Sequence, residues 1–393
     1  MPPRRIFRVI AAAAMVGAGA SAAPFIPSTD DEILERLPYT AGDAAFRQLR
    51  LLSNGLKEQR DNLPLALRIA RGYEELGRAS GDPRYSGYAQ AALAPWWGMT
   101  NPPSEVLTLR ATLNQRVHLF DAALADLGAV LEANPRDTQA LLLRATIFQV
   151  VGRFDKAKSD CGALDGVASE LVSTACLDNV NAMTGSLHES YERLRATLEK
   201  FPRAQPGVRS WALTSLAEMA ARAGLSTQAE AGFRQALAID PTDNYLLAAF
   251  SDFLLDQKRP AEVEGLLKSL TRNDPLLLRY TLALKAMGAP ETQSFIDQLR
   301  DRFEASHLRG DRVHLREEAR FRLQLLGDSS TALRLARENW QVQKEVADIR
   351  ILLESAIAAH EQGEFQIARA WLAETGLEDE NLRALAARTF SAK

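Results

Sequence analysis

Several features that would assign a function to this chain are scarce or missing. It has only two cysteines in 393 residues, aromatic residues make up 7% of it, and its formal net charge is −3. Past the N-terminus, no apolar run approaches the roughly 20 residues that a membrane span needs. A mildly acidic chain also lacks the basic surface typical of nucleic-acid binding. We therefore expect neither a membrane span nor a nucleic-acid partner.

Sequence signatures of catalysis are also missing. The chain has no H-E-x-x-H, no G-x-S-x-G, no phosphate-binding P-loop and no G-x-G-x-x-G. No metal-ligand spacing connects the five histidines, which are His118, His188, His307, His314 and His360. We expect no catalytic, metal or cofactor site. An enzyme accessory protein with a small-ligand pocket is the least favoured alternative.

The first residues have the composition of a cleavable export signal rather than of a plain N-terminal helix. Three arginines among the first eight residues precede a short apolar stretch, and Ala20-Ser21-Ala22 is typical of a cleavage site. Residues 1–22 would then be the signal, and residues 23–61 a lead-in with a capping helix. The paired arginines also resemble a twin-arginine signal. We expect a periplasmic or secreted chain, with the route of export left open.

The clearest positive signal is a pattern that recurs every 34 residues. Residues 210–241 and 244–275 carry apolar and small side chains at the same offsets, and both segments end in proline. Other copies occur between residues 62 and 378. A period of this length is typical of helix–turn–helix repeats, in which small residues let two helices approach closely. The pattern predicts about nine antiparallel helix pairs over residues 62–378 and a capping helix over 379–393.

Glycines mark the expected turns inside these pairs. They follow the first helices, where a left-handed backbone conformation is needed, at Gly152, Gly224, Gly327 and Gly363. Second helices end at Pro135, Pro202, Pro241 and Pro275.

With this period and these small residues, the chain resembles the tetratricopeptide repeat family over roughly residues 62–378. The pattern is clearest over 104–164 and 210–275, although leucine replaces the family's usual tryptophan in most units. The segments GDPRYSGYAQAALAPWW and DDEILERLP are also similar to exported bacterial members whose role is not established. The resemblance implies an all-α, right-handed superhelical solenoid that works in protein–protein interaction.

In this family, partners bind along a concave groove lined by the first helix of each pair. The resemblance implies a partner-binding groove that includes Arg116, Asn179, Trp211, Arg222, Tyr245, Asp252, Asp256, Glu317, Glu354 and Glu361. Trp211 and Tyr245 are the expected anchors. Carboxylates dominate the C-terminal half of this groove, which favours a basic or polar peptide. The alternative is that this face is only solvated and binds no ligand. The family's clamp for terminal carboxylates is not expected, because its lysine, arginine and asparagine residues are not gathered here.

The repeat pattern leaves the role of two pairs of residues undecided. Cys161 and Cys176 would enter an oxidising compartment, but the repeat places Cys161 on a packed side and Cys176 on the open face, so a disulfide is not assumed. Trp96 and Trp97 either pack against the Pro102-Pro103 corner or form an exposed anchor.

The leading hypothesis is a non-catalytic scaffold or adaptor in the bacterial envelope that holds a peptide or partner subunit in its concave groove. The alternative is a fixed structural subunit of an envelope complex, which would use its convex and edge faces. The sequence names no particular partner and gives no oligomeric state.

Overall fold

The computed structural model describes Thr29 and residues 44–388 except position 312. The expected signal over 1–22 lies outside these residues, as does the end of the expected C-terminal helix over 389–393. Every regular element in the described part of the chain is a helix. The predicted all-α class is therefore confirmed.

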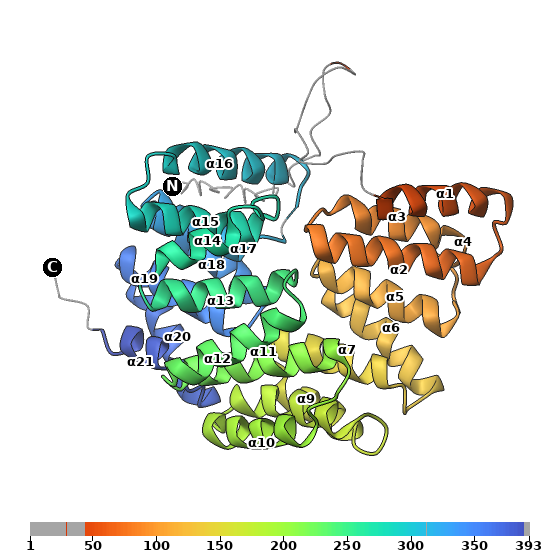
Figure 1. Cartoon of the computed structure of the whole chain (residues 1–393), viewed down its shortest axis with the longest axis horizontal. Helices are drawn as coiled ribbons and strands as arrows, with labels where there is room; N and C mark the ends of the chain where they lie inside the picture. Colours follow the sequence, from red (N-terminus) through yellow and green to blue (C-terminus); the bar gives the residue numbers. More distant parts are fainter. Residues whose placement is uncertain (1–28, 30–43, 312, 389–393) are drawn as a thin grey trace, which may run out of the picture.

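An N-terminal group of helices comes first (Figure 1). α1 packs on the pair α2–α3, and α4 connects this pair to the following repeats. The bounds are Ala44–Glu58 for α1, Leu63–Ser80 for α2, Arg84–Ala92 for α3 and Ala94–Trp97 for α4. Trp96 is buried in the core of this group, and Arg110 lies 5.9 Å from the ring of Trp97. Both tryptophans thus pack in the core of the N-terminal group, and the interpretation as an exposed anchor is wrong.

Antiparallel pairs follow along the rest of the described chain. They are α5 (Ser104–Arg116) with α6 (Phe120–Ala133), α7 (Thr138–Val150) with α8 (Phe154–Ala163), α9 (Glu170–Ala182) with α10 (Leu187–Lys200), α11 (Pro206–Arg222) with α12 (Ser226–Ile239), α13 (Asn244–Asp256) with α14 (Pro260–Leu267), and α15 (Asp274–Met287) with α16 (Thr292–Leu308). The last ones are α17 (Leu315–Arg320), continued by the π-helical turn η1 (Phe321–Leu325), with α18 (Ser329–Val342), and α19 (Val346–Ala358) with α20 (Gln362–Thr375). α21 (Glu380–Ala386) comes last.

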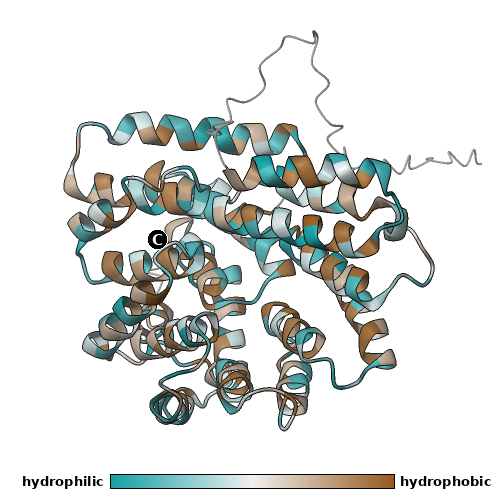
Figure 2. Ribbon diagram, turned by 45° about the vertical axis from the view of Figure 1, so that its right-hand side comes forward, coloured by the Kyte–Doolittle hydropathy of each residue, from teal (hydrophilic) through white to brown (hydrophobic). Residues whose placement is uncertain are grey.

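Small residues allow the two helices of a pair to approach, as the sequence predicts. The alanines at these positions are at most 1% exposed, and they are Ala111, Ala123, Ala145, Ala157, Ala217, Ala229, Ala356 and Ala368. Hydrophobic and hydrophilic residues alternate along the helices, so that both colours recur along the ribbons in Figure 2. The buried apolar residues form successive clusters along the solenoid, and partly buried residues such as Trp211 pack between neighbouring clusters.

The turn inside each pair needs a residue with positive φ, but glycine does not always supply it. Gly152 and Gly224 have φ values of 77° and 74°, as predicted. Gly363 does not, because it lies inside α20, and His360 adopts a φ of 58° instead. His118 and Lys258 occupy the same place in their own repeats with φ values of 58° and 56°. The prediction at Gly363 is wrong because the residue with positive φ is the one that follows the end of the first helix, and in this pair that residue is His360.

An ion pair between an arginine and a buried aspartate recurs between the two helices of three successive pairs. Arg110 contacts Asp126 at 2.6 Å, and Arg144 contacts Asp160 at 2.7 Å. In the next pair the charges are exchanged, with the carboxylate of Asp178 on the first helix and the guanidinium of Arg193 on the second. The fold therefore accepts this ion pair in either orientation.

A disulfide between Cys161 and Cys176 joins α8 to α9. Both residues are buried, at 1% and 5% exposure. The placement of Cys176 on an open face is therefore wrong, because this side of α9 packs against the preceding pair. The disulfide stabilises the contact between two neighbouring repeats.

The C-terminal pairs fold back onto the central ones, so that blue and yellow-green helices meet in Figure 1. The amide of Lys344 donates to the carbonyl of Val150 on α7 at 2.7 Å, and the amide of Leu187 on α10 donates to the Glu378 carboxylate at 3.2 Å. The rings of Phe154 and Trp371 lie 6.4 Å apart. The superhelix is thereby closed on this side.

The N-terminal group also contacts the middle of the chain. The side-chain amide of Asn244 on α13 donates to the carbonyls of Arg78 and Ala79 at 2.9 and 2.7 Å. Repeats far apart in sequence are thus in contact at both ends of the solenoid. No helix in the described residues has both the length and the apolar character that crossing a membrane would require.

Candidate functional site

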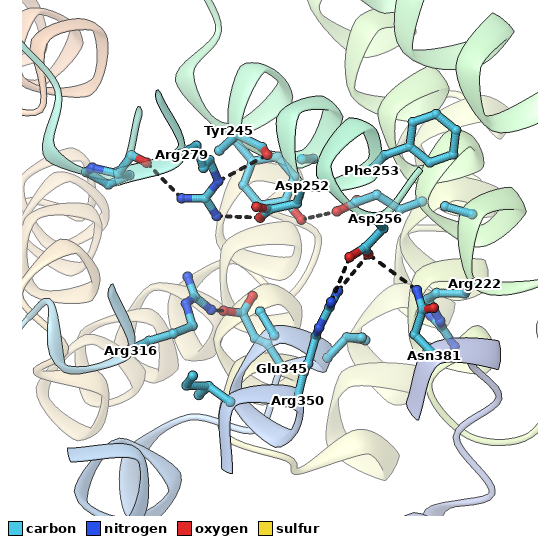
Figure 3. Close-up of a pocket in the computed structure, with 18 of the residues that line it drawn as sticks. Arg222, Tyr245, Asp252, Phe253, Asp256, Arg279, Arg316, Glu345, Arg350 and Asn381 are labelled. Carbon is cyan, nitrogen blue, oxygen red and sulfur yellow. Dashed lines mark hydrogen bonds and ion pairs between the residues drawn. The ribbon is translucent and has the colours of Figure 1, made fainter. Parts of the chain in front are cut away.

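A cavity of about 450 Å³ remains on the concave side of the closed superhelix (Figure 3). Its lining comes mainly from the first helices α9, α11, α13, α15, α17 and α19, with Asn381 of α21 at its edge. This volume is in the range of sites that hold a small molecule or a few side chains. We refer to it below as the central cavity.

Seven of the ten predicted groove residues line the central cavity, namely Asn179, Arg222, Tyr245, Asp252, Asp256, Glu317 and Glu354. The other three lie elsewhere. Arg116 contacts Glu74 at 3.5 Å in the N-terminal group, Trp211 packs between two cores, and Glu361 is exposed at the start of α20. The repeat pattern places all ten along one groove, but the central cavity is lined mainly by the first helices from α9 onwards.

The expected acidic wall carries little free negative charge. Asp252 accepts hydrogen bonds from Arg279 at 2.6 Å and from Arg320 at 2.5 Å. Burial alone would raise the pKa of Asp252, but these two guanidinium groups lower that pKa to about 2. Asp252 is thus a fixed anion held between two fixed cations.

The other predicted carboxylates have similar partners. Arg350 donates to both oxygens of Asp256 at 2.7 Å and to Glu354 at 2.8 Å. Arg316 contacts Glu317 at 3.3 Å and Glu345 at 2.8 Å. Burial would raise the pKa of Glu317, but the guanidinium of Arg316 lowers that pKa to about 2.

The central cavity is therefore close to neutral. Its carboxylates are Glu218, Asp252, Asp256, Glu317, Glu345, Glu354 and Asp379, and its cations are Arg222, Arg279, Arg316, Arg320, Lys344 and Arg350. The prediction of an acidic surface is wrong in this respect. It followed carboxylates along the groove and left out Arg279, Arg316 and Arg320, which lie on α15 and α17 beside these carboxylates.

Arg222 lines the central cavity but its donors are used within the fold. Its Nε and Nη2 atoms each donate to the carbonyl of Glu378 at 3.1 Å, and Nη2 also donates to the carbonyl of Ala182. The guanidinium thus joins α9, α11 and the segment before α21. It holds the wall of the cavity together.

Tyr245 differs from its neighbours because its ring is not packed into a core. Its side chain is 61% exposed, and its hydroxyl donates to Oε1 of Glu218 on α11 at 2.8 Å. Figure 3 shows Tyr245 beside Asp252 and Arg279 at the cavity wall. An exposed aromatic ring among polar groups resembles the anchors found at protein interfaces.

Glu218 is one of the cavity residues that the sequence prediction missed. Confinement among the surrounding helices raises the pKa of Glu218 to about 7, although the hydrogen bond from Tyr245 opposes this shift. Glu218 lies 34 residues before Asp252, so both occupy the same place in successive repeats. Extending the pattern by one period would have included it.

No model of a known protein family matches the sequence, and no curated protein matches it. Solved structures with a similar arrangement of helices include PilW, a widely conserved type IV pilus biogenesis factor, with 19% identity and a TM-score of 0.40 over 52% of this chain and 96% of that one. A tetratricopeptide repeat protein from Parabacteroides merdae has 13% identity and a TM-score of 0.35, with 74% and 98% of the two chains covered. Yeast Tom70 has 13% identity and a TM-score of 0.39, with 87% and 83% covered. These similarities concern the helical architecture alone.

Proposed function

We propose that this chain is a non-catalytic binding protein of the bacterial envelope, which holds a short segment of a protein partner in the central cavity. The observation that carries the proposal is the exposed ring of Tyr245, placed among polar side chains from several helices. An aromatic ring left uncovered in a concave, polar site favours contact with a partner.

Closure of the superhelix favours a short segment over the extended peptide expected from the repeat pattern. The hydrogen bonds from the amide of Lys344 to the carbonyl of Val150 and from the amide of Leu187 to the carboxylate of Glu378 join the two sides between which a long peptide would lie. The remaining space, about 450 Å³, suits a loop tip or a chain end. A partner of this kind would insert a few residues and contact the rim of the cavity with the rest.

Two observations support an envelope location. The N-terminal residues have the composition of an export signal. The buried disulfide between Cys161 and Cys176 is typical of proteins that fold in an oxidising compartment.

The proposal is tested by photo-crosslinking in cells with p-benzoylphenylalanine at position 245. This substitution keeps an aromatic ring at the site, whereas a probe at Asp252 would break two ion pairs. The matched control is position 367, because Ile367 lies on α20 outside the central cavity and is 57% exposed. A discrete protein adduct at 245 and none at 367 supports the proposal. Adducts at 367 alone, or at neither position, contradict it and favour the structural-subunit alternative.

A further inference from the structure

Two of the carboxylates that line the central cavity have no lysine or arginine within 4 Å among the described residues, and these are Glu218 and Asp379. Asp379 caps α21, because its Oδ1 accepts from the amide of Leu382 at 2.9 Å. The one hydrogen bond of the Glu218 side chain to a described residue comes from Tyr245. Of these two carboxylates, Glu218 is thus the one that neither pairs with a cation nor caps a helix.

The repeat itself shows what a carboxylate at this position binds. Asp252, one period later, is held between Arg279 and Arg320. Glu354, four periods after Glu218, is held by Arg350 at 2.8 Å. At these two places the chain supplies its own guanidinium groups, and at Glu218 it supplies none.

The nearest cation on the same helix does not fill this role. Arg222 follows Glu218 by one helical turn, but its guanidinium donates to the carbonyls of Ala182 and Glu378. The other charged groups that face Glu218 are Asp252 of α13 and Glu345 just before α19, and both are negative. Asp252 and Glu345 are already paired with arginines of the cavity, whereas Glu218 has no such partner, so a cation from outside could pair with it.

We propose that Glu218 and Tyr245 form a recognition site for an organic cation, the ammonium or guanidinium of a basic side chain in the partner segment. The carboxylate supplies a charge-assisted hydrogen bond, and the exposed ring of Tyr245 supplies an aromatic face for the cation. This inference rests on the proposed function and adds the chemistry of the group that is held.

Isothermal titration calorimetry on the purified, disulfide-intact chain tests the inference. The titrants are acetylated and amidated Gly-Lys-Gly and Gly-Arg-Gly, the neutral Gly-norleucine-Gly of similar shape, and free n-butylamine. We expect the two basic peptides to bind and the norleucine peptide not to bind. Equal binding of the norleucine peptide, or binding of none, overturns the inference. Butylamine binding as tightly as the peptides would keep the cation site but assign it to a free amine.

Two variants show whether Glu218 carries the recognition. Glu218→Gln keeps an acceptor for the Tyr245 hydroxyl and removes the charge, so we expect affinity for the basic peptides to fall at least about tenfold. Glu132→Gln, on the exposed side of α6, removes the same charge outside the cavity and should leave affinity unchanged. Equal affinities for all three proteins would refute the role of Glu218, while an adduct at position 245 would still support the proposed function.

The proton balance gives an independent readout. Because Glu218 retains a proton near neutral pH, binding of a cation should displace it and release up to one proton. The binding enthalpy should then depend on the ionisation enthalpy of the buffer, and affinity should rise from about pH 6 to about pH 8. Glu218→Gln should abolish both effects. Their persistence in that variant would show that another group releases the proton and would contradict the inference.

Discussion

Arg350 of α19 donates hydrogen bonds of 2.7 Å to both carboxylate oxygens of Asp256, which lies 94 residues earlier at the end of α13. Asn381 of α21 donates to the same carboxylate at 3.3 Å. These contacts join the last helices of the chain to its middle across the central cavity. The shape of the site therefore depends on pairs of residues that are far apart in sequence.

Removing the carboxylate of Asp256 should destabilise the closed form. Asp256→Ala leaves the guanidinium of Arg350 with Glu354 alone, and hydrogen bonds to charged groups contribute about 2 kcal/mol. We expect the free energy of unfolding to fall by about that amount, as measured by urea denaturation. Glu199→Ala, which removes an exposed partner of Arg195, should cost much less. An equal loss in both variants would show that the Arg350–Asp256 pair stabilises the fold no more than an exposed ion pair does.

The recurring ion pair between first and second helices should tolerate exchange of its charges. Asp160→Ala leaves the guanidinium of Arg144 unpaired, which should cost about 2 kcal/mol. The double variant Arg144→Asp, Asp160→Arg should recover most of this loss, because Asp178 and Arg193 already form the exchanged pair in the next repeat. Thermal unfolding of the single and double variants checks this. A double variant no more stable than Asp160→Ala would contradict the equivalence of the two orientations.

The disulfide should contribute measurably to stability. Cys161 and Cys176 are separated by 15 residues, and closing a loop of this size stabilises a fold by about 3 kcal/mol in the chain-entropy account. Cys161→Ser with Cys176→Ser should lower the midpoint of thermal unfolding and make it insensitive to reductant. The unchanged chain should lose stability when reductant is added. A chain that titrates with two free thiols before reduction would contradict this part of the structure.

Two turn glycines distinguish the effect of the contact between Gly152 and Lys344 from the effect of backbone strain alone. Gly152 and Gly327 both have positive φ, at 77° and 73°. A methyl group on Gly152 would lie 2.9 Å from Cγ of Lys344, whereas one on Gly327 would meet nothing within 4 Å. Both alanine variants should lose about 1 kcal/mol from strain, and Gly152→Ala should lose more, in urea denaturation. Equal losses would mean that Lys344 does not lie against this turn.

Glu218 should make stability depend on pH in a predictable direction. Its pKa is about 7 in the folded chain and near 4.5 when unfolded, so the folded state binds more protons between these values. Glu218 therefore lowers stability as pH rises from about 4.5 to about 7, and the effect is constant above that. Because Glu218 is only half-buried, solvent screening limits the effect to about 1–2 kcal/mol. The free energies of unfolding of Glu218→Gln and of the unchanged chain should be equal near pH 4. Above pH 7 the variant should be the more stable of the two. A difference that does not vary with pH would rule this out.

The helix pairs could be predicted because each depends on local pattern. Ala145 and Ala157 mark one close approach, Gly152 marks the turn between them, and the next copies lie at a fixed distance along the chain. The error at Gly363 has a local origin too, since His360 can adopt the left-handed conformation at a cost of about 1 kcal/mol. Local propensity and spacing thus account for most of the fold.

The central cavity could be predicted only in part. The repeat register identified Asp252 and Tyr245, and one more period would have added Glu218. It could not show that Arg320 would lie beside Asp252, because that contact depends on how tightly the superhelix winds. Small rotations between successive pairs add up along a solenoid, and no single repeat encodes the sum.

The most direct test of the account is amide hydrogen exchange at Lys344 in the full chain without a partner. This amide lies between α18 and α19, outside any helix, and it donates to Val150 of α7 across the closed side of the superhelix. The account predicts exchange as slow as that of the amides inside α19, through an opening comparable to global unfolding. Exchange at the rate of an exposed loop would contradict it, since the concave side would then be open and able to take an extended peptide.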